Sequence, residues 1–496
     1  MKNSDKVPIF QKIIYGFGAF SNNLLGTASG SMTIALNLGL GLDPGKIGLL
    51  GMWPRLLDAI TDPLMGYISD NTRTKWGRRR PYIFLGSIFC GLIFSLLWFL
   101  PEKADETFLF FNLPDVGIDG RGRDGFYFCY FLICSLIFYI SYTVWVTPWV
   151  ALGYELTPDY HERTMVMGFS SFIGNCAFVI TPWFLWFMQH DYFGGAEGIM
   201  HGASTLALII SLIVIVCGIL CAIFLKEPFQ KAYCDNKDKK QNVKRESFKE
   251  NTKNFFKGFL ISIKFKPFVK LCSVAFLIFN GFMLISAFST YVIIYYVCQG
   301  DKILGGEITG WAGSAAGIFS FILVILVTAL GRIFGKKNAL LITTSLSVIG
   351  YLSKWWLFTP SNPWLSVIPG FFIAFGFGGL FPLIQAMIAD ICDLDELNTY
   401  QRREGMFGSI FWWVIKIGLA AALGLGGYLL NWTGFNVELI TQTENTLFWM
   451  RFWDVVVPVL TSLIAILILK SYSIDESKAN EIRDELAKRK VNHQST

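Results

Sequence analysis

Three charged side chains interrupt an apolar stretch near residue 60. Arg55, Asp58 and Asp62 lie in "MWPRLLDAITDPLMGYI", where most neighbours are apolar. On a helix that turns ~100° per residue, Asp62 falls about 20° from Arg55 and Asp58 about 60° from it, so one face carries all three. One arginine balances one carboxylate and leaves the other in surplus. Two carboxylates that repel each other favour a bound cation or a proton, so this face predicts a cation site.

The composition indicates that the helix carrying these charges spans a membrane. Of 496 residues, 53% are hydrophobic and 16% are charged, whereas roughly a quarter of the residues in a soluble domain are charged. A spanning helix needs about 20 mainly apolar residues. Segments of that kind are predicted at 13–40, 46–69, 82–100, 126–153, 165–189, 203–225, 268–298, 309–331, 339–358, 364–389, 404–431 and 449–471.

The remaining composition argues against an enzyme. The ten cysteines form no CxxC pair and lie mostly in apolar runs, as small hydrophobic residues do. The four histidines lie in predicted loops or in the tail, and no Ser-His-Asp or metal-ligand spacing is visible. We therefore expect no cofactor and no metal other than a transported cation.

The predicted spans divide into two halves of six. We expect an N-terminal half at 1–225, a cytoplasmic linker at 226–266, a C-terminal half at 267–472 and a cytoplasmic tail at 473–496. A faint repeat relates the halves, because "GYELTPDYHERTMVMGFSSF" resembles "ADICDLDELNTYQRREGMFGSIF". Each begins with an acidic helix end and continues through a polar turn into the next helix.

Lysine and arginine predict the orientation of the chain. With both termini inside, the inner segments hold 31 of these residues and the outer segments hold 5. The positive-inside rule therefore places both termini in the cytoplasm. It also accounts for the basic linker as an inner anchor, so we expect no nucleic-acid partner.

A structural ion-pair network is the competing interpretation of the buried charges. A charge at the centre of a spanning helix costs at least ~2.5–3.5 kcal/mol, so these side chains must face a polar cavity in either case. The matching positions of the eighth span are Ala316, Phe319 and Leu323. A requirement of the fold itself should place charges there too, and their absence favours cation coupling.

Three further residues extend or adjoin this site. Pro63 cannot donate to the carbonyl of Ala59, which becomes a possible extra cation ligand. Lys416 stands about 12 residues into the eleventh predicted span. It needs an acidic partner, and we expect the acidic pair of the second span to supply it, either as a coupling device or as a static salt bridge. Lys354, beside two tryptophans near a span end, is expected to reach the membrane interface.

Four motifs carry a resemblance to a known family. They are "YGFGAF", "RLLDAITDP" followed by "GYISDNTRTKWGRRRPY", "YTVWVTPW" and "VIKIG". With them the chain resembles the glycoside–pentoside–hexuronide:cation symporters, the melibiose permease group of the major facilitator superfamily. The resemblance implies an all-α membrane protein of 12 transmembrane helices, with the major facilitator fold of two six-helix halves. It assigns cation binding to Asp58, Thr61, Asp62 and Thr143 and coupling to Arg55 and Lys416. The family's cations are sodium, lithium or protons.

The chain departs from the galactoside-binding members in the solute pocket. Their Lys-Asp pair after the first motif and their aspartate before the fourth-span proline correspond here to Asn22, Asn23 and Val146. Amide side chains still donate and accept hydrogen bonds, so the pocket is altered and not abolished. Packing is the alternative role of each candidate. The candidate solute-binding residues are Asn22, Asn23, Trp149, Ser171, Phe381, Gln385 and Trp412.

The basic loop after the second span resembles the gating loop of the superfamily. Salt bridges on the inner side would form in one access state and break in the other. Anchoring by positive charge is a further role of the same residues. The candidate gating residues are Asp70, Arg73, Arg78, Arg79, Arg163 and Arg402, with possible partners Glu155, Asp159, Asp390, Asp393 and Arg403.

We therefore expect a symporter that uses Na⁺ or H⁺ to import a sugar or glycoside-like solute by alternating access. The expected setting is a bacterial inner membrane, and the expected partners are the solute, the coupling cation and membrane lipid, with the chain acting as a monomer. Two alternatives stay open. One is a carrier of a lysophospholipid-like or other non-sugar solute, and the other is a membrane sensor that keeps the fold without transport.

Overall fold

A computed structural model describes most of the chain. The described residues are 6–72, 74–100, 107–108, 111–112, 122–157, 160–195, 198–227, 264–400 and 403–494. Within these ranges the regular structure is helical apart from one antiparallel hairpin, β1 (Thr107–Phe108) with β2 (Phe111–Asn112). The helices form two compact units, the first made of Met1–Arg245, Asp301–Ser314 and Leu423–Ile440, and the second of Glu246–Gly300, Ala315–Ala422 and Thr441–Thr496.

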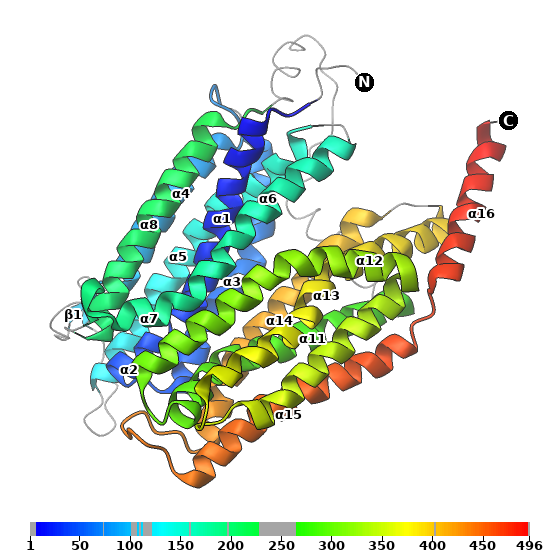
Figure 1. Ribbon diagram of the computed structural model, residues 1–496. Helices are drawn as coiled ribbons and strands as arrows, with labels where there is room; N and C mark the ends of the chain where they lie inside the picture. Colours follow the sequence, from blue (N-terminus) through cyan, green and yellow to red (C-terminus); the bar gives the residue numbers. More distant parts are fainter. Residues whose placement is uncertain are drawn as a thin grey trace. The chain divides into compact units, whose positions relative to one another are not determined.

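The first unit is built on six long helices that lie side by side (Figure 1). They are α1 (Ile9–Ser31), α3 (Pro44–Asn71), α4 (Arg80–Trp98), α5 (Gly122–Glu155), α6 (Tyr160–Ile180) and α8 (Ile199–Phe224). Short pieces connect them: α2 (Ile34–Leu40), η2 (Thr181–Trp183), α7 (Phe184–Gln189) and η3 (Asp191–Phe193). The predicted span 13–40 is thus broken, because α1 ends at Ser31 and α2 begins at Ile34.

Helix α3 packs along α5, and α4 packs against both α5 and α8. Close approach is possible where glycine replaces a side chain. A Cβ atom on Gly86 of α4 would lie 2.8 Å from the backbone nitrogen of Trp145 on α5. The fully buried Trp145, Phe94 and Phe138 fill the surrounding contact. This packing turns the charged face of α3 toward α5, which is the arrangement that positions the candidate site.

The second unit also consists of long helices. It contains α11 (Lys266–Val292), the π-helical η5 (Ile293–Val297), α13 (Ile368–Thr399) preceded by η6 (Pro363–Val367), α15 (Glu444–Lys470), α16 (Glu476–Gln494) and most of α12 (Lys302–Leu357) and α14 (Glu404–Trp432). Its hydrophobic core joins α11, α13 and α15. The tail helix α16 packs on α13 and contributes Ala479, Ile482 and Leu486 to that core.

Helix α12 covers two of the predicted spans, 309–331 and 339–358. Gly335 has a φ of 77° and breaks the helical backbone between them, a conformation that glycine adopts at little cost. In the described part of the chain, nine helices are long and apolar enough to cross a membrane. Helix α3 is not among them, and it carries Arg55, Asp58 and Asp62 near its middle.

Candidate functional site

The first carboxylate of the site, that of Asp58, is bonded by one threonine, and a second threonine lies beside the first. Thr143 on α5 donates from Oγ1 to Asp58 Oδ1 at 2.9 Å, and the Thr61 hydroxyl lies 3.2 Å from that of Thr143. Thr143 directs its one proton to Asp58, so the proton of Thr61 has two possible acceptors, Thr143 Oγ1 and the backbone carbonyl of Asp58 at 3.5 Å. Asp58 is 2% exposed. The structure thus brings together Asp58, Thr61 and Thr143 across the contact of α3 with α5.

The second carboxylate has a hydroxyl partner that the sequence analysis did not include. Thr147 donates from Oγ1 to Asp62 Oδ1 at 3.1 Å. A signal for it was present, since Thr143 and Thr147 are four residues apart, as are Asp58 and Asp62. Residues four apart share a helix face. Two parallel helices with this spacing can therefore form two threonine–aspartate pairs, one above the other.

Arg55 lies beside the site without closing it. Its Nη1 atom is 3.9 Å from Asp58 Oδ2, too far for a hydrogen bond although close enough for attraction. The guanidinium lies 4.8 Å from the centre of the Tyr139 ring, a cation–π contact. Among the described residues no group accepts a hydrogen bond from its buried Nε atom. The arginine therefore offsets charge at Asp58 and leaves Oδ1 to the Thr143 hydroxyl.

Polar side chains continue from Arg55 toward α1. Tyr142 donates from its hydroxyl to Asn22 Oδ1 at 2.6 Å, and Asn22 Nδ2 lies 3.3 Å from Asn23 Oδ1. Ser29 Oγ lies 3.2 Å from the hydroxyl of Tyr139. Both asparagines are half-buried. The predicted solute residues of α1 thus adjoin the aromatic neighbours of Arg55, and Tyr142 is an addition that the sequence analysis missed.

Two other predicted solute residues of the first unit have different surroundings. The Trp149 ring stacks on Tyr15 with centroids 4.8 Å apart, and the side chain is 4% exposed. It also covers Gly18, where a Cβ atom would clash with the indole. Ser171 is exposed on α6. Trp149 therefore packs between α1 and α5, and the structure does not bring Ser171 into these contacts.

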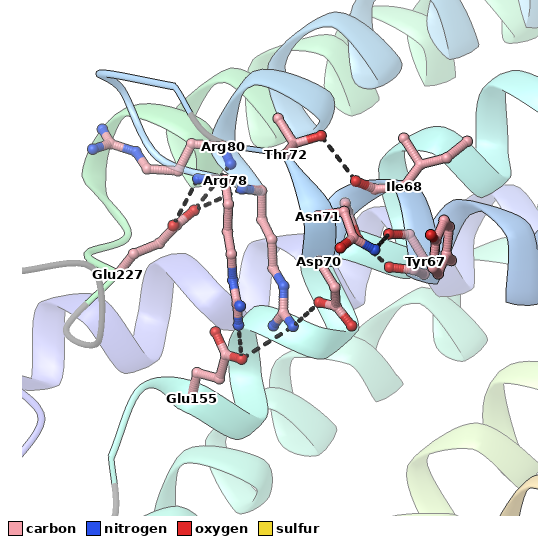
Figure 2. A network of polar contacts seen from close by, with 12 residues as sticks. Tyr67, Ile68, Asp70, Asn71, Thr72, Arg78, Arg80, Glu155 and Glu227 are labelled. Atoms are coloured by element: carbon pink, nitrogen blue, oxygen red, sulfur yellow. Dashed lines mark hydrogen bonds and ion pairs between the residues drawn. The ribbon is translucent and has the colours of Figure 1, made fainter. Parts of the chain in front are cut away.

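A reciprocal cap joins the loop after α3 to the end of α8 (Figure 2). The Glu227 carboxylate accepts from the backbone N–H groups of Arg78, Arg79 and Arg80 at 3.0, 3.0 and 3.1 Å. In return, the Arg80 side chain donates to the carbonyls of Ala222 and Ile223 at 2.6 Å each. An anion at a helix start and a cation at a helix end both complement the helix dipole. Glu227 was absent from the prediction, although it directly follows the sixth span.

The same loop reaches the ends of α3 and α5 (Figure 2). Both Arg78 and Arg79 pair with Glu155, the latter at 3.0 Å, and Arg79 also pairs with Asp70 at 2.7 Å. Arg163 is not in this network, because it donates to the carbonyl of Thr157 at 3.2 Å. Predicted gating residues Arg73 and Arg402, with Asp159, lie outside the described residues.

Comparison with known proteins decides the family. The family described as MFS/sugar transport protein matches residues 14–476 of the chain. The chain belongs to this family. It is a cation symporter of the major facilitator superfamily and a multi-pass integral membrane protein, not an enzyme. The predicted family and twelve-helix fold are confirmed.

Three similar proteins show the breadth of the family and the fold. The isoprimeverose transporter of Lactiplantibacillus pentosus is 23% identical, over 97% of this chain and 92% of its own. The sodium-dependent lysophosphatidylcholine symporter 1-B of Danio rerio is 22% identical, over 99% and 92%. The crystal structure of a D-xylose-proton symporter matches with a TM-score of 0.61 at 15% identity, over 92% of this chain and 97% of that one.

The second unit of this symporter carries the other predicted solute residues. The rings of Phe381 on α13 and Trp412 on α14 stack with centroids 5.4 Å apart and planes 13° apart. Gln385 is exposed on α13, and Lys416 is half-buried on α14. The bridge expected between Lys416 and the acidic pair of α3 stays a prediction.

The second unit has its own charged network at the start of the ninth span. Lys336 Nζ lies 2.6 Å from Asp390 Oδ2, and Arg483 of α16 lies 2.7 Å from Asp390 Oδ1. Arg403 donates from Nε to Asp395 at 2.8 Å, and this hydrogen bonding raises the pKa of the guanidinium. The tail helix thus takes part in holding the end of α13.

The expectation that Lys354 reaches the membrane interface is wrong. Its Nζ atom bonds both oxygens of Asp454 at 3.0 Å and Ser289 Oγ at 2.6 Å, and the residue is 5% exposed. Trp356, two positions later and 69% exposed, points about 200° away around the helix. The tryptophans therefore indicated the exposed face of α12, and Lys354 lies on the opposite, buried face.

Proposed function

We propose that this chain couples Na⁺ or H⁺ to the import of a sugar or glycoside-like solute by alternating access. The observation that carries the proposal is the pair of carboxylates on α3, each held by a hydroxyl from α5 and together matched by one loosely placed arginine. The face of α3 itself carries two acidic side chains and one basic side chain. A transported cation removes that imbalance.

Cation binding is assigned to Asp58, Asp62, Thr61 and Thr143. Hard oxygen ligands of this kind suit an alkali cation, and a proton on either carboxylate meets the same electrostatic need. When the cation arrives, the attraction between Arg55 and Asp58 weakens. Arg55 can then shift against Tyr139 and Tyr142, which connects cation occupancy to the polar side chains of α1. Lys416 is the proposed coupling residue of the C-terminal half.

The solute is proposed to bind next to Asn22, Asn23 and Tyr142. Amide and phenol groups donate and accept hydrogen bonds, as recognition of sugar hydroxyls requires. The isoprimeverose transporter supports a glycoside over other polar solutes. Phe381, Gln385 and Trp412 are the candidates in the C-terminal half, where a flat aromatic face suits the apolar face of a sugar ring.

The salt bridges of Arg78 and Arg79 with Glu155 and Asp70 are proposed to act as the inner gate. They would hold α3, α4 and α5 together in one access state and separate in the other. The halves that move are proposed to be 1–225 and 267–472. Both termini and the 226–266 linker are placed in the cytoplasm of a bacterial cell, on the positive-inside rule.

A lysophospholipid is the second candidate solute. The Danio rerio relative named for lysophosphatidylcholine covers almost the whole chain at nearly the same identity as the sugar transporter. Asn22, Asn23 and Val146, in place of the Lys-Asp pair and the aspartate of the galactoside-binding members, are compatible with this cargo as well.

Solute uptake into right-side-out membrane vesicles tests the proposal. A panel of pentosides, hexosides and lysophosphatidylcholine is offered under an imposed sodium gradient, an imposed pH gradient or neither. Accumulation of a glycoside above its external concentration under one gradient is the expected result. Uptake of lysophosphatidylcholine alone would select the second candidate, and gradient-independent equilibration of every solute would refute cation coupling.

A further inference from the structure

We infer that Thr147 is a further residue of the cation site, one that positions Asp62 as Thr143 positions Asp58. This inference rests on the proposed cation coupling. It would give the site two levels, each made of one carboxylate from α3 and one hydroxyl from α5.

The first argument is the register of the two helices. The Thr143–Asp58 and Thr147–Asp62 bonds both join residues 85 positions apart, at 2.9 and 3.1 Å. Equal separations mean that α3 and α5 run parallel and stay in register over a full turn. At ~1.5 Å rise per residue, the two levels are about 6 Å apart along the helices.

The second argument comes from two prolines at matching positions. Asp62 is followed by Pro63 within α3, and Thr147 is followed by Pro148 within α5. Proline lacks the N–H that would bond the carbonyl four residues earlier. The carbonyls of Ala59 and Val144 are therefore both released from the helical pattern, directly after the residues of the first level. Carboxylate, hydroxyl and carbonyl oxygens then surround the same stretch from both helices.

The third argument is that a hydroxyl group can donate to a carboxylate and, with its oxygen lone pairs, bind a cation at the same time. In this structure the single proton of Thr147 points at Asp62, which leaves its oxygen lone pairs available. A bound cation attracts those lone pairs while the proton continues to hold the carboxylate. Valine at this position keeps the shape and removes both functions, whereas serine keeps the hydroxyl.

Cation titration of the purified full-length protein tests the assignment. The melting temperature is measured against Na⁺ or Li⁺ at constant ionic strength, with choline as the replacement cation, and against pH without either ion. Wild type is compared with Thr147→Val, Thr147→Ser and the matched control Thr205→Val. The Thr205 hydroxyl is on α8 and bonds only a carbonyl of its own helix among the contacts described.

In Thr147→Val, the cation concentration at the midpoint of the titration should be about tenfold higher than in wild type. This is the effect expected for loss of one hydrogen bond to a charged group. Thr147→Ser should stay within about twofold of wild type, because it restores that bond, and Thr205→Val should titrate like wild type.

Two results would overturn the inference while leaving cation coupling intact. One is a wild-type midpoint in Thr147→Val, and the other is an equal change in Thr147→Val and Thr205→Val. Thr147→Val could also have a lower melting temperature in choline while its cation midpoint is unchanged. That result would overturn the inference too, because it would show that Thr147 contributes only packing. A wild-type protein that responds to neither Na⁺, Li⁺ nor pH would instead refute the proposed function itself.

Discussion

Each unit of this symporter buries a cluster of charges, and the two clusters are built differently. In the second unit, Lys354 and Asp454 form a balanced pair with two contacts of 3.0 Å, and Ser289 bonds both partners. In the first unit, Arg55 lies 3.9 Å from Asp58, and the hydroxyls of Thr143 and Thr147 donate to Asp58 and Asp62.

The difference supports a structural role for the pair in the second unit and the proposed transport role for the cluster in the first. A balanced, fully hydrogen-bonded pair is costly to break and has no need of a further ion. The face of α3 itself carries two carboxylates and one arginine, and the hydroxyls that hold the carboxylates are neutral, so a bound cation would fit there. Burial of charge in a membrane helix is therefore not enough to indicate an ion site, and the local charge balance is the more informative property.

Loss of one carboxylate in the first unit should have the largest effect on transport. Asp58→Asn or Asp62→Asn removes the surplus charge, so concentrative uptake should fall about a hundredfold, to the level of equilibration. Gradient-driven uptake in vesicles measures this, with Asp43→Asn at the N-cap of the same helix as the control. Sodium- or proton-driven accumulation that persists in both variants would contradict the proposed site.

Breaking the balanced pair should have the largest effect on stability. Asp454→Asn leaves the Lys354 ammonium buried without its counter-charge, which typically costs about 3–5 kcal/mol. The double variant Lys354→Met with Asp454→Leu should recover most of that loss, because no charge stays buried. Thermal unfolding in detergent compares the two, and a double variant no more stable than the single one would contradict a purely structural pair.

Removal of Arg55 should change the cation affinity more than the stability, the reverse of the effect expected at Asp454. Arg55→Met takes away a positive charge that competes with the cation at Asp58, so the Na⁺ midpoint should fall severalfold, as expected for a charge near 4 Å in a partly hydrated site. The melting temperature should change much less than in Asp454→Asn. A higher Na⁺ midpoint in Arg55→Met would show that the arginine supports cation binding and does not oppose it.

The smallest effect is expected at Pro63. Pro63→Ala restores the N–H that bonds the Ala59 carbonyl, which is then no longer available as a cation ligand. The Na⁺ midpoint should rise about two- to fivefold, because one neutral ligand is worth roughly 1 kcal/mol or less. Pro458→Ala in α15 is a matched control, as that proline is also inside a helix. An unchanged midpoint in Pro63→Ala would remove the carbonyl from the site.

Much of the fold could be predicted because each membrane span is encoded by a continuous stretch of the sequence. Each needs a run of apolar residues, so the predicted spans 203–225 and 449–471 match α8 and α15 to within one residue at their C-terminal ends. The break of the first predicted span near residue 32 was missed, since "SGSMTIAL" contains no proline or charge to end a helix.

The candidate site was predictable in part for the same reason. Arg55, Asp58 and Asp62 are conspicuous because charges are costly in a bilayer. Thr147 and Tyr142 were missed because hydroxyl groups are inexpensive in a helix, where they bond their own backbone. Glu227 was missed because a carboxylate just after a span looks like any polar residue in a loop.

The chain's order of residues was sufficient to predict twelve spans and a charged face on α3, because hydropathy and helical periodicity act within one segment, and the family came from motifs that the sequence shares with known symporters. Which neighbour meets that face required the packed helices. Hydrogen-bond partners 85 residues apart, and the burial of Lys354 against Asp454, depend on how the helices are placed in space. Local patterns determine which groups need a partner, and tertiary packing alone determines which partner each one finds.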